Sequence, residues 1–180
     1  MRVIAGMARG RRLAPVPKGT RPVSDRAREG LFSSLGPAVV DASVLDLYAG
    51  TGALGIEALS RGAASAELVD SSEAAIRTIR ENLSLTGLEG RVRRMTASRF
   101  LATSRGPFDL VFLDPPYDTP EPDISDVLRA LPPSLAPAST CVLTRPSRNT
   151  TDVIPVHFVV TRRLSYGDTL VLVFREERWA

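Results

Sequence analysis

The sequence of 180 residues contains one cysteine, one histidine and one lysine. The single cysteine and the single histidine bear on which disulfide and metal sites the chain can form. Cys141 alone allows no internal disulfide and no thiolate metal cluster, so we expect a buried strand residue in a cytoplasmic protein. His157 stands among Val156, Phe158 and Val159 without a carboxylate cluster, so we expect it to be structural and expect no metal. No run of about 18 apolar residues occurs, so the sequence predicts no membrane-spanning helix.

The net charge is only +3, but the basic residues concentrate near the N-terminus. Residues 1–28 hold 8 of the 23 basic side chains and a single acidic one, Asp25. Such an excess attracts phosphate groups because each contact releases a condensed counterion, although a solvated edge would have the same composition. The candidate nucleic-acid-binding residues of this segment are Arg2, Arg9, Arg11, Arg12, Arg21, Arg26 and Arg28.

The chain divides into an N-terminal basic extension, residues 1–22, and an α/β domain, residues 23–180. Within the extension, residues 2–5 and 12–16 are candidate strands separated by glycines, which predicts a β-hairpin. Prolines and a glycine then interrupt regular structure before the first helix of the domain.

Strand and helix patterns alternate along the rest of the chain. Repeated strand–helix units predict a mostly parallel sheet with helices on both faces. Two apolar runs about the turn Tyr166-Gly167-Asp168 predict a C-terminal antiparallel hairpin. The predicted strands are 44–48, 66–70, 91–95, 108–113, 140–143, 156–163 and 169–174, and the predicted helices are 25–35, 53–59, 73–86 and 124–131.

A glycine-rich loop, Gly50 to Gly55, follows one of these strands and opens the next helix. Such a loop lets the backbone approach a ligand closely because no Cβ intervenes. Asp70 lies 20 residues after Gly50, at the end of the next strand, where a carboxylate can accept hydrogen bonds from ribose hydroxyls. The same spacing matches the NAD fingerprint, so the loop alone indicates a nucleotide without identifying it.

Asp46 favours S-adenosylmethionine over a dinucleotide. A carboxylate inside an apolar strand is costly unless a partner satisfies it, and S-adenosylmethionine carries an ammonium group where a dinucleotide does not. Asp46 would also be explained if it only tied down the glycine loop through backbone N–H groups. The stretch from Asp46 to Gly52 resembles the first motif of S-adenosylmethionine-dependent methyltransferases. The candidate cofactor-binding residues here are Asp46, Tyr48, Ala49, Gly50, Thr51, Gly52, Asp70 and Ser71.

The tetrapeptide Asp114-Pro115-Pro116-Tyr117 follows the apolar strand 108–113 and supplies the candidate catalytic residues. An exocyclic amine on a base is a poor nucleophile, and Asp114 with the Pro115 carbonyl can accept its N–H bonds and direct its lone pair. The prolines fix φ and hold these acceptors rigid, while Tyr117 offers a face on which a flipped base stacks. A proline-rich turn capped by Asp114 is the plainer interpretation, which the glycine loop makes less favourable.

Together these segments resemble the RsmD family, bacterial methyltransferases that modify guanine N2 in 16S ribosomal RNA. The resemblance covers nearly the whole chain and is most specific at the N-terminus. The segments that carry it are Arg2–Gly6, Arg9–Arg11, Thr20–Glu29, Leu45–Leu59 and Asp114–Tyr117.

This resemblance implies a Rossmann-like class I methyltransferase fold with a seven-stranded sheet and an N-terminal extension that recognises the RNA. It implies in-line methyl transfer from S-adenosylmethionine to the N2 amine of a flipped guanine in 16S RNA. The sequence leaves open whether naked RNA or an assembling 30S particle is the substrate, although the small recognition surface favours the particle, and nothing in it demands more than a monomer. Asp70 would be the ribose-binding acid, and Ala97 and Ser98 would lie beside the adenine. Many relatives have an acid at that place, and some have Phe instead of Tyr117.

Three other functions remain open on the sequence. A DNA adenine-N6 methyltransferase would use the same tetrapeptide, although a chain this short lacks a separate domain for reading DNA sequence. A catalytically silent assembly factor would bind ribosomal RNA without needing Asp114. An NAD-dependent oxidoreductase is least favoured because no residues for hydride transfer accompany the glycine loop.

Overall fold

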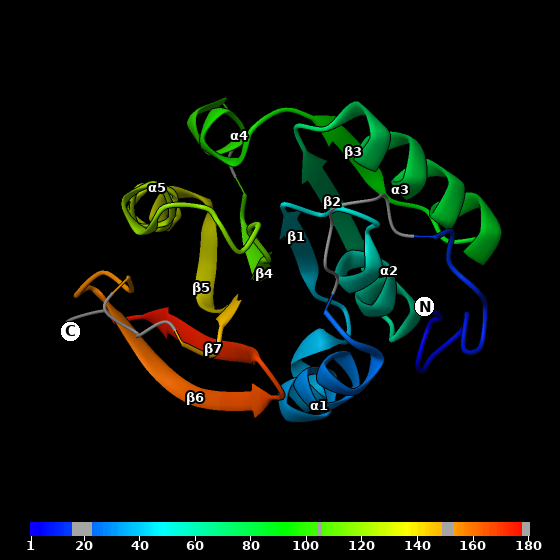
Figure 1. Ribbon diagram of the computed structural model, residues 1–180, viewed down its shortest axis with the longest axis horizontal. Helices are drawn as coiled ribbons and strands as arrows, with labels where there is room; N and C mark the ends of the chain where they lie inside the picture. The colour runs from blue at the N-terminus through cyan, green and yellow to red at the C-terminus, as the bar shows by residue number, and fades with distance from the viewer. Residues whose placement is uncertain (16–22, 104–105, 149–152, 178–180) are drawn as a thin grey trace.

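The computed structural model describes residues 1–15, 23–103, 106–148 and 153–177 (Figure 1). One seven-stranded sheet runs through it in the order β3-β2-β1-β4-β5-β7-β6. The first five strands pair in parallel, and β7 lies antiparallel between β5 and β6, which confirms the predicted mixed sheet and C-terminal hairpin. The strands are β1 (Ser43–Leu47), β2 (Ser65–Asp70), β3 (Arg91–Arg94), β4 (Phe108–Leu113), β5 (Leu135–Pro146), β6 (Phe158–Tyr166) and β7 (Thr169–Glu176).

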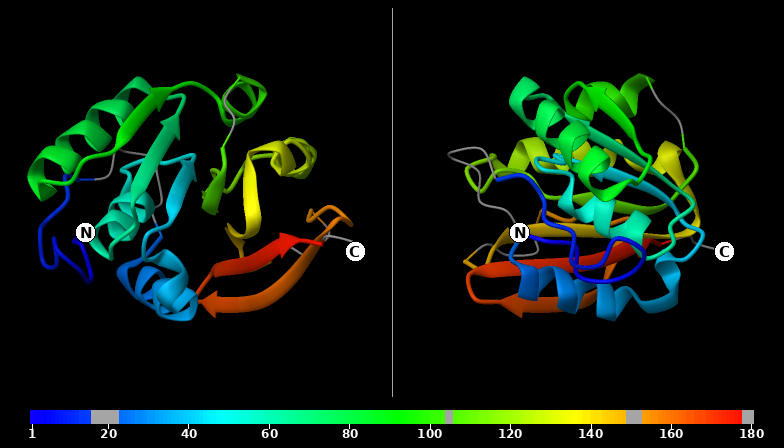
Figure 2. Two further views of the ribbon diagram at one scale, coloured as in Figure 1. Left: turned by 180° about the vertical axis from the view of Figure 1, so that it is seen from behind. Right: turned by 90° about the vertical axis from the view of Figure 1, so that its right-hand side faces the viewer.

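Helices cover both faces of the sheet (Figures 1 and 2). One face carries α1 (Asp25–Leu35), α2 (Ala53–Ser60) and α3 (Glu73–Thr86), and the other carries α4 (Ala97–Thr103) and α5 (Glu121–Arg129). Short 3₁₀ helices span Gly36–Val39 and Pro132–Ser134. None of the helices within the described ranges is long and apolar enough to cross a membrane.

Serine caps explain where two of these helices begin. Ser24 Oγ accepts a hydrogen bond from the Ala27 N–H at the start of α1, and Ser72 Oγ accepts one from Ala75 at the start of α3. Each cap satisfies a backbone donor that has no partner within the helix. These starts were predicted from the sequence, whereas α4 was not.

Strand β1 shows how the sheet separates two cores. Its side chains alternate between the faces, so Val44 packs into the core beneath α1, α2 and α3, while Leu45 and Leu47 pack beneath α4 and α5. All three are completely buried. Alternation therefore directs Asp46 toward the α2 side, where the glycine loop enters its helix.

The predicted N-terminal β-hairpin is not formed as two strands. Arg2 and Arg12 make one isolated antiparallel bridge, and the backbone bonds between the two segments run from Val3 N to the Arg11 carbonyl, from Leu13 N to the Met1 carbonyl and from Gly10 N to the Val3 carbonyl. The chain between them pairs with α2 instead, because Met7 N donates to the Ser60 carbonyl at 2.7 Å. The segment between the two candidate strands therefore packs against α2, and the pairing of the candidate strands stays limited to this one bridge.

Gly6 is the residue that permits this approach. A Cβ on Gly6 would lie 1.7 Å from the Ser60 carbonyl oxygen, and the residue has a positive φ of 81°. Both conditions exclude ordinary side chains there. Ser60 completes the contact through its hydroxyl, which accepts a hydrogen bond from Ala8 N and donates one to the Ala5 carbonyl.

Glu57 of α2 joins the N-terminal segment to the domain. Its completely buried carboxylate accepts hydrogen bonds from Ile4 N at 2.8 Å and Ala5 N at 3.1 Å. Arg61 lies 2.7 Å from it and Arg28 of α1 lies 3.6 Å from it. One buried side chain thus holds together the N-terminal segment, α1 and α2.

Candidate active site

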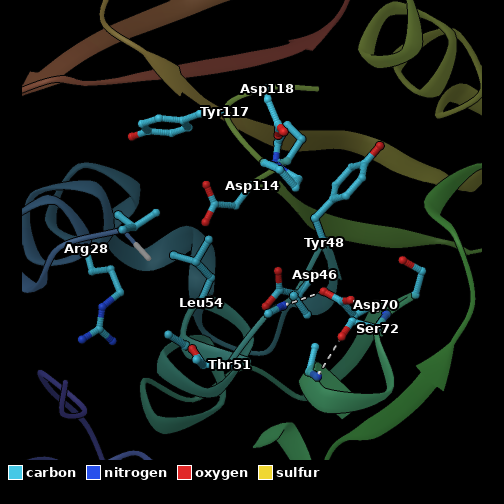
Figure 3. A pocket seen from close by; sticks show the side chains of 18 residues that line it. Arg28, Asp46, Tyr48, Thr51, Leu54, Asp70, Ser72, Asp114, Tyr117 and Asp118 are labelled. Atoms are coloured by element: carbon cyan, nitrogen blue, oxygen red, sulfur yellow. Dashed lines mark hydrogen bonds between the residues drawn. The ribbon is translucent and has the colours of Figure 1, made fainter. Parts of the chain in front are cut away.

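The candidate site lies at the carboxyl ends of β1, β2 and β4, which are neighbours in the sheet. The glycine loop follows β1, Asp70 ends β2, and residues 114–117 follow β4. Open α/β sheets bind ligands at this edge because successive strands deliver their loops to one place. These loops line a cavity of about 500 Å³ (Figure 3).

Asp46 of β1 has one satisfied and one unsatisfied oxygen. Its Oδ2 accepts a hydrogen bond from Gly55 N of α2 at 2.9 Å, so it does anchor the helix that follows the loop. Its Oδ1 is buried without a hydrogen-bond partner among the described residues. The pKa of Asp46 is raised to about 8, mainly by burial; the bond from Gly55 N opposes this shift, and the neighbouring Asp114 and Asp70 add to it. An oxygen of this kind suits a cationic ligand group.

Asp70 connects the glycine loop to the start of α3. Its Oδ2 accepts from Gly50 N at 2.9 Å and its Oδ1 accepts from Ser72 N at 2.8 Å (Figure 3). Each carboxylate oxygen has two lone pairs, so both oxygens keep the capacity to accept a further hydrogen bond.

A second cavity of about 330 Å³ adjoins the first. Tyr48, Asp70 and Ser71 line both cavities, and Ala97 and Ser98 at the start of α4 line the second. The two cavities therefore lie side by side, one at the glycine loop and the other at the start of α4. Such a pair of cavities can hold a ligand with an amino-acid end, a sugar and a base.

Tyr48 lies between the two cavities with an unusual backbone conformation. Its φ of 60° lies in the left-handed region, which a non-glycine residue adopts at a cost of about 1–3 kcal/mol. Burial raises the pKa of its phenol, and Asp123 of α5 raises it further. A strained residue at the junction of two cavities indicates that its side-chain direction matters for the site.

Asp114 directs its carboxylate into the first cavity (Figure 3). Thr144 of β5 donates a hydrogen bond from its hydroxyl to Asp114 Oδ1. The pKa of Asp114 is raised to about 6 because the effect of burial exceeds the opposing effect of the bond from Thr144. The group is therefore mainly ionised at neutral pH, where it acts as a hydrogen-bond acceptor.

Tyr117 lies on the same side of the cavity as Asp114. Its hydroxyl is 2.8 Å from the hydroxyl of Thr169, the first residue of β7. Pro115 and Pro116 precede it and also line the cavity. The tetrapeptide therefore brings an acceptor and an aromatic ring to one wall.

Arg28 lines the cavity as well, but as a buried residue. Its side chain is completely buried, and its Nη2 donates to the Arg2 carbonyl at 2.6 Å and to Asp25 Oδ1 at 2.7 Å. The prediction from charge alone placed it among surface contacts for RNA. The structure places it beneath the N-terminal segment, because Glu57 and Asp25 offer carboxylates there.

The other predicted basic contacts differ in their placement. Arg11 donates to the Leu85 carbonyl of α3 at 3.2 Å, which fastens the N-terminal segment to that helix. Arg21 lies outside the described residues. The side chains that are exposed to solvent are those of Arg2, Arg9, Arg11, Arg12 and Arg26.

The lone cysteine and histidine lie away from the cavity lining. Cys141 is free and completely buried in β5, as predicted, and burial raises the pKa of its thiol. The His157 ring contacts the Phe158 ring in a tilted arrangement, with the centroids 4.5 Å apart and the planes at 40°. Within the described ranges, no group of three His, Cys, Asp or Glu side chains is placed to hold a metal ion.

Comparison with known families establishes what this site is related to. The protein family described as Conserved hypothetical protein 95 matches residues 1–175. The chain belongs to this family. Because the match begins at residue 1, the N-terminal segment belongs to the family pattern together with the sheet.

Named relatives of this Conserved hypothetical protein 95 member are rRNA methyltransferases. It is 48% identical over 120 residues to ribosomal RNA small subunit methyltransferase D of Escherichia coli, a match that covers 65% of this chain and 60% of that protein. It is 43% identical over 123 residues to the putative rRNA methyltransferase YlbH of Bacillus subtilis, covering 65% and 67%. The chain thus spans less than two thirds of the Escherichia coli relative in the aligned region.

The solved structure of the putative methyltransferase yhhF from Escherichia coli superposes over much more of the chain. It has a TM-score of 0.84 and 36% identity, and the superposition covers 98% of both chains. The Conserved hypothetical protein 95 member therefore has the class I methyltransferase fold that the resemblance implied.

The structure brings most of the predicted site residues of this family member to the two cavities. Gly52 caps α2 in a left-handed conformation without lining either cavity. The roles of these residues stay predictions. The residues that line the cavities are Asp46, Tyr48, Ala49, Gly50, Thr51, Asp70, Ser71, Ala97, Ser98, Asp114, Pro115, Pro116 and Tyr117.

Sequence reasoning missed several residues that contact the site. Thr144 and Thr169 bond to Asp114 and Tyr117 from strands that are distant in sequence. Asp123 and Asp126 of α5 line the second cavity, where only Ala97 and Ser98 at the start of α4 had been considered. Thr144 directly follows the apolar residues 141–143, and this position was a usable signal for it. Nothing in the local sequence marked the others.

Proposed function

We propose that this protein transfers a methyl group from S-adenosylmethionine to the exocyclic N2 amine of a guanine in small-subunit ribosomal RNA. The single observation that carries this proposal is one cavity that joins the glycine loop to the Asp114–Tyr117 tetrapeptide. A ligand held by the loop then faces an acceptor suited to an aromatic amine. The named relatives, which are rRNA methyltransferases, support ribosomal RNA as the substrate.

The chain's own residues fit the cofactor. Asp46 Oδ1, buried and without a partner among the described residues, would bind an ammonium group, and Asp70 would accept hydrogen bonds from ribose hydroxyls. Ala97 and Ser98 would contact the adenine in the second cavity. When bound, S-adenosylmethionine supplies an electrophilic methyl group on a sulfonium.

Asp114 and Tyr117 would orient the acceptor base. The ionised carboxylate of Asp114 accepts an N–H of the amine, which directs the nitrogen lone pair away from the ring plane. Tyr117 stacks on the flipped base and excludes water from one side of it. Neither step requires a covalent enzyme intermediate.

The N-terminal segment would contact the RNA backbone. We propose residues 1–22 as the recognition extension and residues 23–180 as the catalytic domain. A domain with one basic segment has little surface for reading sequence, so the substrate would supply shape within an assembling 30S particle. A monomer suffices for this arrangement.

Methyl transfer from labelled S-adenosylmethionine tests the proposal. Naked small-subunit RNA, partly assembled small subunits and duplex DNA, all from cells lacking this gene, would be offered in parallel and analysed by mass spectrometry. N2-methylguanosine in either RNA sample supports the proposal and shows whether ribosomal proteins are needed. N6-methyladenine in DNA would show that the substrate is DNA and not ribosomal RNA. If S-adenosylmethionine binds tightly but no methyl group is incorporated, the protein would be a catalytically silent binding factor.

Cofactor binding is expected to release protons near neutral pH. The pKa of Asp46 is about 8 without ligand, so the group is largely protonated at pH 7, and a bound ammonium favours its ionised form. The affinity for S-adenosylmethionine should therefore rise as the pH increases toward 8. Calorimetry in buffers of different ionisation enthalpy measures the protons released.

Asp46→Asn is the matched variant for this measurement. It should bind S-adenosylmethionine more weakly and lose the pH dependence, because an amide cannot change charge. Proton release that is the same in this variant and in the unsubstituted protein would show that another group titrates.

Reversing the charges of Arg9, Arg11 and Arg12 together should weaken RNA binding. All three are exposed, and each phosphate contact contributes a slope of about −0.7 to −0.9 in the dependence of log affinity on log salt. The measurement is RNA affinity from 50 to 300 mM salt, on the order of the range where such contacts are screened. Reversal of the exposed Arg99 and Arg129 on the opposite face is the control.

Equal effects from both sets would remove the special role of the N-terminal segment. If neither set of reversals changes the RNA affinity, the N-terminal segment has a structural role only.

A further inference from the structure

Two threonines outside the tetrapeptide contact its two functional side chains. Thr144 of β5 donates to the Asp114 carboxylate, and the hydroxyl of Thr169 of β7 lies 2.8 Å from that of Tyr117. We propose that Thr144 and Thr169 are positioning residues that set the orientation of the Asp114 carboxylate and the Tyr117 ring. This inference rests on the proposed function and extends the site to the C-terminal strands.

The surroundings of Thr144 explain why a hydroxyl is present at this position. Thr144 is completely buried and follows Cys141, Val142 and Leu143, which are also completely buried. A buried hydroxyl is costly unless it is hydrogen-bonded, whereas valine has nearly the same shape and no such cost. The packing of β5 would therefore accept valine, and the bond to Asp114 is what the hydroxyl adds.

This bond determines which way Asp114 presents its oxygens. The terminal torsion of aspartate is broad, so the carboxylate plane is not fixed by its own rotamer preferences. With Thr144 bonded to Oδ1, the plane is held and Oδ2 keeps its capacity to accept from the amine. An acceptor held in advance needs no reorganisation during the reaction, and small misplacements cost about 100-fold in rate.

Thr169 acts at the far end of the Tyr117 side chain. Thr169 is only 8% exposed, and it pairs with Pro146 of β5 and Tyr166 of β6, so two neighbouring strands hold its backbone. Pro116 restricts the backbone on one side of Tyr117, and the hydroxyl contact restrains the ring on the other. The ring is thereby restrained at both ends, which favours one stacking plane for the base.

The charge environment of Asp114 gives the proposal an independent readout. Burial raises the pKa of Asp114, and the hydrogen bond from Thr144 opposes that effect by favouring the ionised form. Removing the hydroxyl should therefore raise the pKa above its present value of about 6. The other ionisable side chains that line this cavity are Arg28, Asp46, Tyr48, Asp70, Tyr117 and Asp118.

The first experiment compares Thr144→Val with Thr144→Ser, and uses Thr140→Val in the same strand as the control. Thr144→Val should lower kcat by roughly 10- to 100-fold with an unchanged KM for S-adenosylmethionine, because the cofactor residues are not touched. The acidic limb of its pH–rate profile should move to higher pH. Thr144→Ser should restore both the value of kcat and the position of this limb. A thermal melt of each variant verifies that it is folded.

Carbon-13 NMR of labelled aspartate measures the Asp114 pKa without any substrate, with Asp114→Asn used to assign the signal. A higher pKa in Thr144→Val supports the proposal whether or not the RNA substrate is correct. An unchanged pKa overturns it for Thr144. Absence of methyl transfer by the unsubstituted protein would instead count against the proposed function, so the two failures are distinguishable.

A double-mutant cycle tests Thr169. Thr169→Val and Tyr117→Phe each remove one side of the hydroxyl contact, and each should lower kcat/KM for RNA by roughly 5-fold or more. The double variant should be no worse than either single variant, because the same contact is lost. Effects that multiply would show that the two hydroxyls act independently, which overturns the positioning role of Thr169.

Discussion

Asp114→Ala is expected to reduce methyl transfer by about 1,000-fold or more, a loss typical of removing a group aimed at charge that develops in the transition state. Asp114 directs its carboxylate into the cavity, and no other residue of the tetrapeptide carries a negative charge there. The affinity for S-adenosylmethionine should stay nearly the same, because the proposed cofactor contacts come from β1, β2 and α4. Single-turnover transfer and calorimetry measure the two quantities separately.

Asp118→Ala is the control for this prediction, since Asp118 lines the same cavity but is exposed. It should keep most of the activity. Activity of the unsubstituted protein should also fall as the pH drops through about 6, because protonation of Asp114 removes the acceptor. Turnover by Asp114→Ala close to that of the unsubstituted protein would refute the role of the tetrapeptide.

Glu57→Ala is expected to lower the free energy of unfolding by about 3–5 kcal/mol, the loss typical of breaking a buried ion pair from one side. The substitution removes the acceptor for Ile4 N and Ala5 N and leaves Arg28 buried without its partner in α2. Urea unfolding monitored by circular dichroism measures the change.

Glu73→Ala provides the comparison on the surface. Glu73 pairs with Arg77 on α3, and both side chains are mostly exposed, so the loss should be below about 1 kcal/mol. Similar losses for the Glu57 and Glu73 variants would show that the N-terminal segment contributes little to folding.

The features that the sequence predicted well are those encoded locally. The apolar run of β4 and the serine caps of α1 and α3 are properties of a few consecutive residues, and the structure confirms them. The two site loops were found for the same reason, because Gly50 and Asp114 each stand in a short segment of distinctive chemistry. Strand order then brings the loops together without further information.

The features that were missed depend on pairing between distant segments. Arg28 was counted as a surface charge because composition does not show that Glu57, far along the chain, is buried opposite it. The N-terminal hairpin failed for a related reason, since Ile4 and Ala5 donate to Glu57 instead of to a second strand. Short candidate strands and local charge do not reveal which distant side chain a backbone group or a guanidinium binds.

The position of β7 has a consequence for the order in which the protein is built. β7 lies between β5 and β6 in the sheet although it follows both in the chain. During synthesis β6 therefore emerges before the strand that connects it to the sheet, and it stays unpaired until β7 inserts. Thr169 arrives with β7, so Tyr117 gains its hydroxyl partner only in this late step. A nascent chain consequently holds its proposed cofactor-binding loops well before it can align the base.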